Sequence, residues 1–159
     1  MRTTKWECFL KALLAILLAG STAIAQEANI WTVVRYPADE TVQVTLVSPS
    51  SPGGGGKADV VGPVGRLQVL RDESKTSVSV DVRGLRDGTH AIYAIDAQAN
   101  ATKLGVFSGP MHKETYDLPL NFDKFMVIVS RNAGLRSLPE DAQIELYSAT
   151  PKGLSKVPR

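Results

Sequence analysis

Cysteine and histidine are scarce in this chain of 159 residues, and their scarcity excludes several kinds of chemistry. Cys8 is the only cysteine, so the chain can close no internal disulfide. Of the two histidines, His90 is expected at the start of a strand, half-buried, and His112 in a loop. Zinc and copper sites commonly use three or four nitrogen or sulfur donors. We therefore expect no bound metal and no cofactor.

Sequence motifs of catalysis are also missing. No Gly-x-Ser-x-Gly motif occurs, and a hydrolytic triad needs a histidine that lies beside a serine and a carboxylate in space. Two carboxylate pairs, Asp72-Glu73 and Glu140-Asp141, lie beside turn signals, where adjacent side chains point in different directions rather than forming an acid–base pair. The chain is therefore predicted not to be an enzyme.

Charge of one sign is scarce as well. The formal net charge is +2, and acidic and basic residues alternate along the chain. Only residues 151–159 carry basic side chains without acidic ones, and this stretch is predicted to be a flexible basic tail. Binding to nucleic acid usually needs a basic face or stripe. The sequence therefore favours no nucleic-acid partner.

The one long apolar run lies at the N-terminus, where it has the form of a signal peptide. Arg2, Lys5 and Lys11 form a basic region, and Ala12–Gly20 forms the apolar segment that follows it. A membrane-spanning helix needs about 20 apolar residues. This run is therefore too short to span a bilayer comfortably.

A cleavage site follows the apolar segment. Ala23 and Ala25 fit the small-x-small pattern that a signal peptidase reads, which makes Gln26 the expected new N-terminus. Residues 1–25 are therefore predicted to be a helical signal peptide. We expect the mature protein to be periplasmic or secreted, with no stable membrane span. An uncleaved signal anchor is the alternative.

Helical periodicity is missing after residue 25, and strand patterns take its place. Thr41–Val47 and Thr76–Arg83 alternate apolar and polar residues, which is typical of half-buried strands. Further strands are expected at 30–36, at 66–70 and around Ile144 and Leu146. Strands at intervals of about 8–12 residues indicate a sandwich or barrel. We expect residues 26–150 to form one all-β domain, an immunoglobulin- or fibronectin-like β-sandwich of seven to nine mostly antiparallel strands.

Three segments depart from simple alternation. Ala91–Ile95 and Phe125–Val129 are apolar on both faces, so they are predicted to be central strands covered on both sides. Ser48–Gly56 ends in four consecutive glycines and is predicted to be a flexible exposed loop. A phosphate-binding loop would need a hydroxyl residue after the lysine, but Ala58 follows Lys57.

Aromatic side chains supply the candidate ligand surface. Tyr147 is out of phase with Ile144 and Leu146 in its expected strand, which predicts an exposed ring. Tyr116 and His112 complete this candidate surface. A carbohydrate-binding accessory domain would need two or three aromatic side chains exposed on one surface.

One stretch of the chain resembles a known family. His90–Asp96, followed by Leu104–Phe107, is similar to two successive strands in the extracytoplasmic domain of anti-sigma-K factors. Those strands have the forms Tyr-x-Leu-Trp-Leu-Ile and Leu-Gly-x-Phe. Phe125–Ser130 and the turn Asn132–Gly134 resemble the next strand and loop of that domain. The similarity covers residues 85–150.

The resemblance implies a non-catalytic β-sandwich outside the cytoplasm. Residues 1–11 leave no room for the sigma-binding part of such factors, so sigma-factor binding is not expected. The sequence predicts an exported binding module that contacts a protein or glycan of the cell envelope, in sensing or scaffolding. The alternatives are a carbohydrate-binding accessory domain and, least favoured, a metal-dependent or hydrolytic enzyme.

Overall fold

The computed structural model describes three stretches of the chain, residues 32–49, 62–138 and 142–157. The predicted signal peptide with its cleavage site lies outside them. So do the four glycines Gly53–Gly56 of the predicted loop and the carboxylate pair Glu140-Asp141. In the described stretches, no helix is long and apolar enough to cross a membrane.

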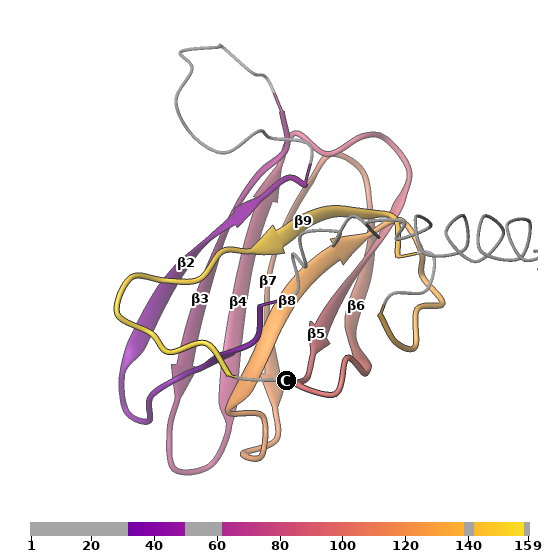
Figure 1. The fold of residues 1–159 in the computed structure, drawn as a ribbon. Coiled ribbons are helices and arrows are strands. Elements are labelled where there is room, and N and C mark those ends of the chain that lie inside the picture. The colour runs from indigo at the N-terminus through magenta and orange to yellow at the C-terminus, as the bar shows by residue number, and fades with distance from the viewer. Residues whose placement is uncertain (1–31, 50–61, 139–141, 158–159) are drawn as a thin grey trace, which may run out of the picture.

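Nine strands make up the fold, and all their pairings are antiparallel (Figure 1). In chain order they are β1 (Val34–Arg35), β2 (Thr41–Val47), β3 (Val64–Arg71), β4 (Thr76–Arg83), β5 (Thr89–Ile95), β6 (Ala101–Ser108), β7 (Met111–Leu118), β8 (Lys124–Ser130) and β9 (Ile144–Ser148). The described residues include no helix. The prediction of an all-β protein is confirmed.

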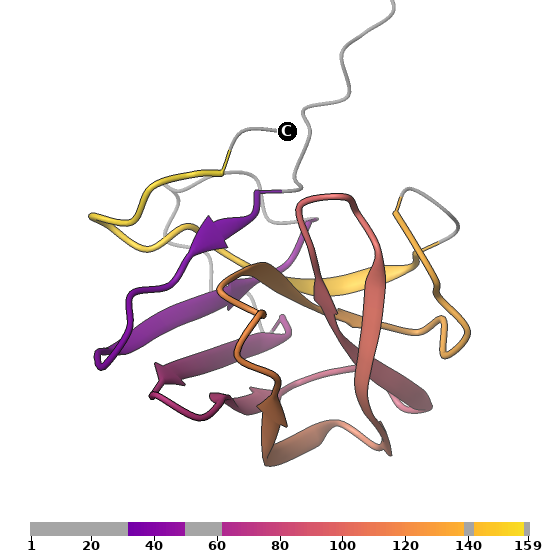
Figure 2. The same cartoon turned by 90° about the horizontal axis from the view of Figure 1, so that it is seen from below.

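The strands form one curled sheet that nearly closes on itself. Hydrogen-bonded neighbours follow the order β6-β5-β8-β9-β2-β3-β4-β7, and β1 pairs with β8. Seen from below, the strands wrap around a common interior (Figure 2). The end strands β6 and β7 are joined by Gly109 and Pro110 but are not paired with each other. A sandwich would divide the strands between two separate sheets, so that finer prediction is not confirmed.

Alternating residues fill the interior of the curled sheet. In β4, Val78, Val80 and Val82 are buried in this interior between more exposed polar residues, as the alternation predicts. On β3, Gly65 makes room for a neighbour, because a Cβ there would lie 2.8 Å from Leu46 Cδ1. Burying a valine or leucine side chain stabilises the fold by about 1.5–3 kcal/mol. The interior is therefore a major source of stability.

Strands β5 and β8 are buried on both faces, which confirms the prediction for these two segments. Their inner faces contribute Ile92 and Val127 to the interior. Their outer faces carry Tyr93 and Ile128, which pack in a second cluster with Leu135 from the segment between β8 and β9. The Tyr93 hydroxyl accepts a hydrogen bond from the Leu135 amide at 3.2 Å. This segment therefore covers the sheet from outside.

His90 lies at the start of a strand, as predicted, but its burial and the position of His112 differ from the prediction. His112 is within strand β7 rather than in a loop. His90 is fully buried rather than half-buried, because its side chain faces the interior from the start of β5. The pairing of β4 with β7 brings His112 opposite Val82. Because polar residues occupy inward positions of β7, its sequence does not show the apolar alternation that predicts a strand.

Residues near the C-terminus contact the first strand. Lys156 forms an antiparallel bridge with Val34, and the Val157 amide donates a 2.9 Å hydrogen bond to the Val33 carbonyl. Leu154 packs against the interior cluster. The sequence pattern indicates none of these contacts in the predicted basic tail.

Candidate functional site

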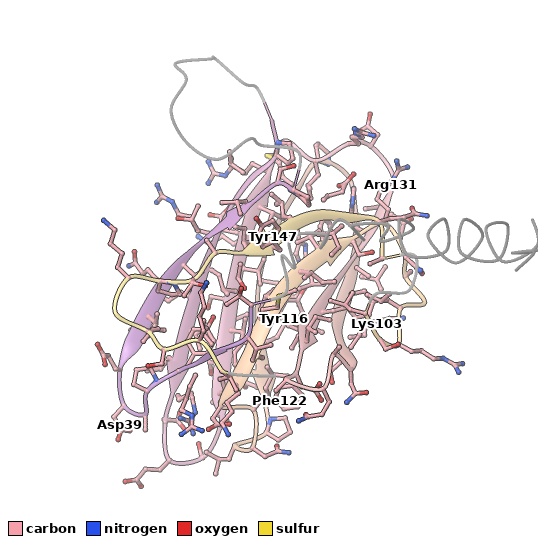
Figure 3. All side chains as sticks on the ribbon, in the orientation of Figure 1. Asp39, Lys103, Tyr116, Phe122, Arg131 and Tyr147 are labelled. Carbon is pink, nitrogen blue, oxygen red and sulfur yellow. The ribbon has the colours of Figure 1, made fainter. Side chains whose placement is uncertain are left out.

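The structure separates the three residues of the predicted ligand surface. His112 and Tyr116 lie together on β7, with His112 Nε2 and Tyr116 Oη 2.8 Å apart. Tyr147 lies on β9 beside Ile128 and packs, half-buried, against the outer cluster. Tyr116 and Tyr147 are both labelled in Figure 3. Tyr147 therefore packs against a different cluster from Tyr116, and a ligand-binding role of these residues stays a prediction.

A column of rings closes the gap between β6 and β7. Phe107 of β6 lies between His90 of β5 and His112 of β7, with ring centroids 5.2 Å and 4.2 Å away. The rings of Phe107 and His112 are nearly parallel, at 10°. Because β6 and β7 are not paired, these stacked contacts replace backbone hydrogen bonds there. We call His90, Phe107, His112 and Tyr116 the ring column.

Tyr116 is held at one end of the ring column by two partners. Its hydroxyl donates to Glu114 Oε2 at 3.0 Å, so it accepts from His112 Nε2 at 2.8 Å. Gly105 of β6 lies across the gap between β6 and β7. A Cβ at this position would lie 2.7 Å from Tyr116 Oη, so the absence of a side chain leaves room for the tyrosine ring. Burial and the Glu114 carboxylate raise the pKa of the Tyr116 phenol. This phenol therefore stays a protonated donor and does not act as a base.

The raised phenol pKa values predict lower stability in alkaline solution. Burial raises the pKa of Tyr36 and of Tyr116 above the ordinary value of about 10. As the pH rises through about 10, the unfolded chain loses phenol protons that the folded chain keeps, so the free energy of unfolding falls. Urea denaturation from about pH 8 to about pH 11 measures this decline. Tyr116→Phe should make the decline shallower, and an unchanged slope would contradict the assignment.

A buried polar pair lies at the other end of the ring column. His90 Nε2 is 2.8 Å from the Arg86 carbonyl oxygen, so this nitrogen carries a proton and donates it. His90 Nδ1 lies 3.1 Å from Glu145 Oε2, and the two side chains are 0% and 12% exposed. Neither atom has a well-aligned hydrogen bond to a described group. The two atoms therefore face each other in a buried contact between the imidazole and the carboxylate.

A bulge in β9 decides where Ile144 and Glu145 lie. Between Leu146 and Ile144, β9 has one residue more than β8, so Glu145 is left without a partner in the strand pairing. Ile144 and Tyr147 therefore pack in the same outer cluster, whereas Leu146 faces the interior. Tyr147 lies on the outer face, as alternation with Leu146 predicts, but its ring is half-buried rather than exposed because it packs against the outer cluster.

The outer face of β2, β3, β4 and β7 carries a broad hollow of about 940 Å³. The strand register arranges its outward side chains in two rows. The neutral row consists of Gln43, Gln68, Ser79 and Thr115. The charged row consists of Thr45, Arg66, Asp81 and Lys113. We call this surface the polar hollow.

Most polar groups in the polar hollow are available to a ligand. The Ser79 and Thr115 hydroxyls bond to each other at 2.7 Å, and Asp81 pairs with Arg83 at 3.3 Å. Side chains that make no hydrogen bond or ion pair with a described residue are those of Gln43, Thr45, Arg66, Gln68 and Lys113. Amide groups donate and accept hydrogen bonds, and the two cations strengthen bonds to anions.

The sequence contains a partial signal for the polar hollow. Gln43 and Thr45 are the polar positions of one predicted strand, and Ser79 and Asp81 are those of another. The same pattern is expected of any sheet face in contact with water. The sequence does not show the order of the strands in the sheet, and it is this order that places the polar positions side by side.

Comparison with known proteins offers no relative from which a function could be transferred. No protein-family model matches the chain. No curated protein matches it. No solved structure matches it. Function must therefore be inferred from this chain's own residues, and the resemblance to anti-sigma-K factors stays a prediction.

Proposed function

We propose that this chain is an exported, non-catalytic binding module whose polar hollow binds a ligand in the cell envelope. The observation that carries the proposal is the pair of polar rows on four adjacent strands. Because β3 and β4 are paired along their length on both sides, their side chains are presented on a rigid surface and lose little freedom on binding. Export is inferred from the signal-peptide pattern of residues 1–25.

An accessory domain that stacks sugars on aromatic rings is less well supported. Among the described residues, the buried rings are those of Tyr36, Tyr93, Phe107 and Phe125. The half-buried rings are those of Tyr116, Phe122 and Tyr147. No aromatic side chain of the described stretches lines the polar hollow. Hydrogen bonds and charge, rather than stacking, would hold a ligand there.

A hydrolytic or metal-dependent enzyme is also less well supported. Phe107 lies between His90 and His112, so its ring separates the two imidazoles. Three or more histidine, cysteine, aspartate or glutamate side chains do not gather around a metal position anywhere in the described stretches. Burial raises the pKa of Tyr116, so its phenol stays protonated at neutral pH and is not available as a general base.

Two finer predictions belong to this proposal. One is a relationship to immunoglobulin- or fibronectin-like sandwiches, and the other is a relationship to the extracytoplasmic domain of anti-sigma-K factors. The resemblance to the anti-sigma-K domain implies a non-catalytic domain outside the cytoplasm, and the proposed role in envelope sensing or scaffolding follows from that implication. A shared fold does not by itself identify the ligand.

Export predicts a defined processed N-terminus. Cleavage after Ala25 should make Gln26 the first residue and should remove Cys8, leaving a mature chain without a thiol. Intact-mass analysis and thiol titration of the protein from the periplasm or medium measure both results. Recovery of the uncleaved chain in the membrane fraction would contradict the prediction.

Binding through the polar hollow predicts sensitivity to its neutral row. Gln68→Ala removes an amide from the middle of this row and should weaken ligand binding about fivefold, the usual loss for one hydrogen bond. Fluorescence anisotropy against a panel of envelope oligosaccharides and peptides measures the affinity. Thr102→Ala, an exposed polar change on β6 outside the polar hollow, is the control. Equal affinities of the two variants for every ligand would reject the proposal.

A further inference from the structure

We propose that the ligand of the polar hollow is an acidic polysaccharide. Its hydroxyl groups would bind to the neutral row, and its anionic groups would bind to Arg66 and Lys113. This inference rests on the proposed function and names the ligand class of the same site. Three features carry it: the length of the rows, their charge, and the hydrogen-bonding character of their side chains.

The length of the rows indicates an extended ligand. The register places Gln43 opposite Gln68, Gln68 opposite Ser79, and Ser79 opposite Thr115. Neighbouring strands lie about 4.8 Å apart, so a row of four side chains spans roughly 14 Å. A chain of several sugar units reaches along such a row. A single small molecule would contact only part of it.

The charge of the polar hollow favours an anion. Arg66 and Lys113 have no acidic partner among the described residues, whereas Asp81, between them in the row, pairs with Arg83. The other carboxylate at the hollow, that of Glu114, accepts a hydrogen bond from a phenol of the ring column. An arginine and a lysine without such partners favour a carboxylate or sulfate.

The side chains of the polar hollow match the hydroxyl groups of a sugar. The amides of Gln43 and Gln68 both donate and accept, as sugar hydroxyls do. A peptide bound by strand addition lies along an unpaired strand edge, whereas the polar hollow lies on the face of the sheet and is lined by outward side chains. A single-stranded nucleic acid needs aromatic rings on which its bases stack, and no described residue supplies such a ring to the polar hollow.

Calorimetric titration of the processed protein with three oligosaccharides of equal length tests the inference. The probes are an oligogalacturonate, which carries carboxylates, a sulfated oligogalactose and a neutral oligogalactose. We expect at least one acidic probe to bind about a hundredfold more tightly than the neutral probe, roughly tenfold for each of the two cations, and added salt to reduce the difference. The tighter of the two acidic probes identifies the anionic group.

Charge-removing variants locate the binding site. Arg66→Gln and Lys113→Gln should each weaken binding of the acidic probe about tenfold and leave the neutral probe unchanged. The matched controls Arg131→Gln and Lys103→Gln remove the same charges from exposed positions outside the polar hollow (Figure 3). All four residues are exposed, so melting temperatures should not change. The controls should bind like the original protein.

The outcomes separate failure of the inference from failure of the proposed function. Equal affinity for acidic and neutral probes, or unchanged binding by Arg66→Gln, would overturn the acidic-polysaccharide inference. Absence of binding to all three probes would also overturn the acidic-polysaccharide inference. In that case, a peptide that binds the protein and binds more weakly to Gln68→Ala would still support the proposed function of the polar hollow. If the acidic probes bind and no variant in the polar hollow weakens their binding, both the acidic-polysaccharide inference and the proposed function are overturned.

Discussion

Replacing Phe107 with alanine should lower the free energy of unfolding by about 3–5 kcal/mol. Phe107 is 9% exposed and its ring lies between those of His90 and His112. It is the ring of the column that β6 supplies, and β6 and β7 are not paired. The substitution therefore leaves a cavity and also removes the contacts that hold the two ends of the sheet together.

Urea denaturation measures the loss of stability, and hydrogen exchange locates it. The amides of β6 and β7 should exchange faster in Phe107→Ala, because the gap between these strands opens more often. Val106→Ala is the matched control: Val106 is the next residue on β6, is 51% exposed, and should change stability by no more than about 0.5 kcal/mol. Equal effects of both substitutions would show that the ring column does not close the sheet.

Ile128→Ala should lower the free energy of unfolding by about 2–5 kcal/mol. Ile128 is fully buried on the outer face of β8, opposite Tyr93 of β5. Leu135 and Leu138 pack in the same cluster, so the substitution leaves a cavity beneath the segment that covers the sheet. Thermal and urea denaturation of the purified variant measure the effect.

Deletion of Gly53–Gly56 is the contrasting change. The predicted loop should tolerate it within about 1 kcal/mol, because loop-closure entropy changes slowly with length. A loss of several kcal/mol would show that the glycines pack against the fold or bind something. If the deletion and Ile128→Ala melt alike, the assignment of core and loop is wrong.

Apolar patterns predict the parts of the fold that depend on local alternation. The run Thr76–Arg83 alternates, and it forms β4 with Val78, Val80 and Val82 in the interior. Ala91–Ile95 and Phe125–Val129 are apolar throughout, and they lie within β5 and β8, buried on both faces. In these segments burial of apolar side chains is the main driving force, so the sequence pattern shows it directly.

The apolar pattern does not predict the parts of the fold in which polar residues face inward. In β7, His112 and Tyr116 occupy inward positions, because the strand lies at the end of the sheet and these two side chains bond to each other. The buried pair His90 and Glu145 is equally hidden, since a bulge in β9 brings the carboxylate to the imidazole. No spacing pattern in the sequence predicts the contact between His90 and Glu145, because the two residues are far apart in the chain.

The amino-acid sequence by itself determined the all-β class and the two doubly buried strands, because alternation and apolar runs record how each strand is covered. The tertiary structure alone decided that β6 and β7 end a single curled sheet, where rings replace strand pairing. It also decided that polar residues of four strands form one hollow. Strand order and register arise from long-range packing, and a one-residue shift turns each side chain to the opposite face.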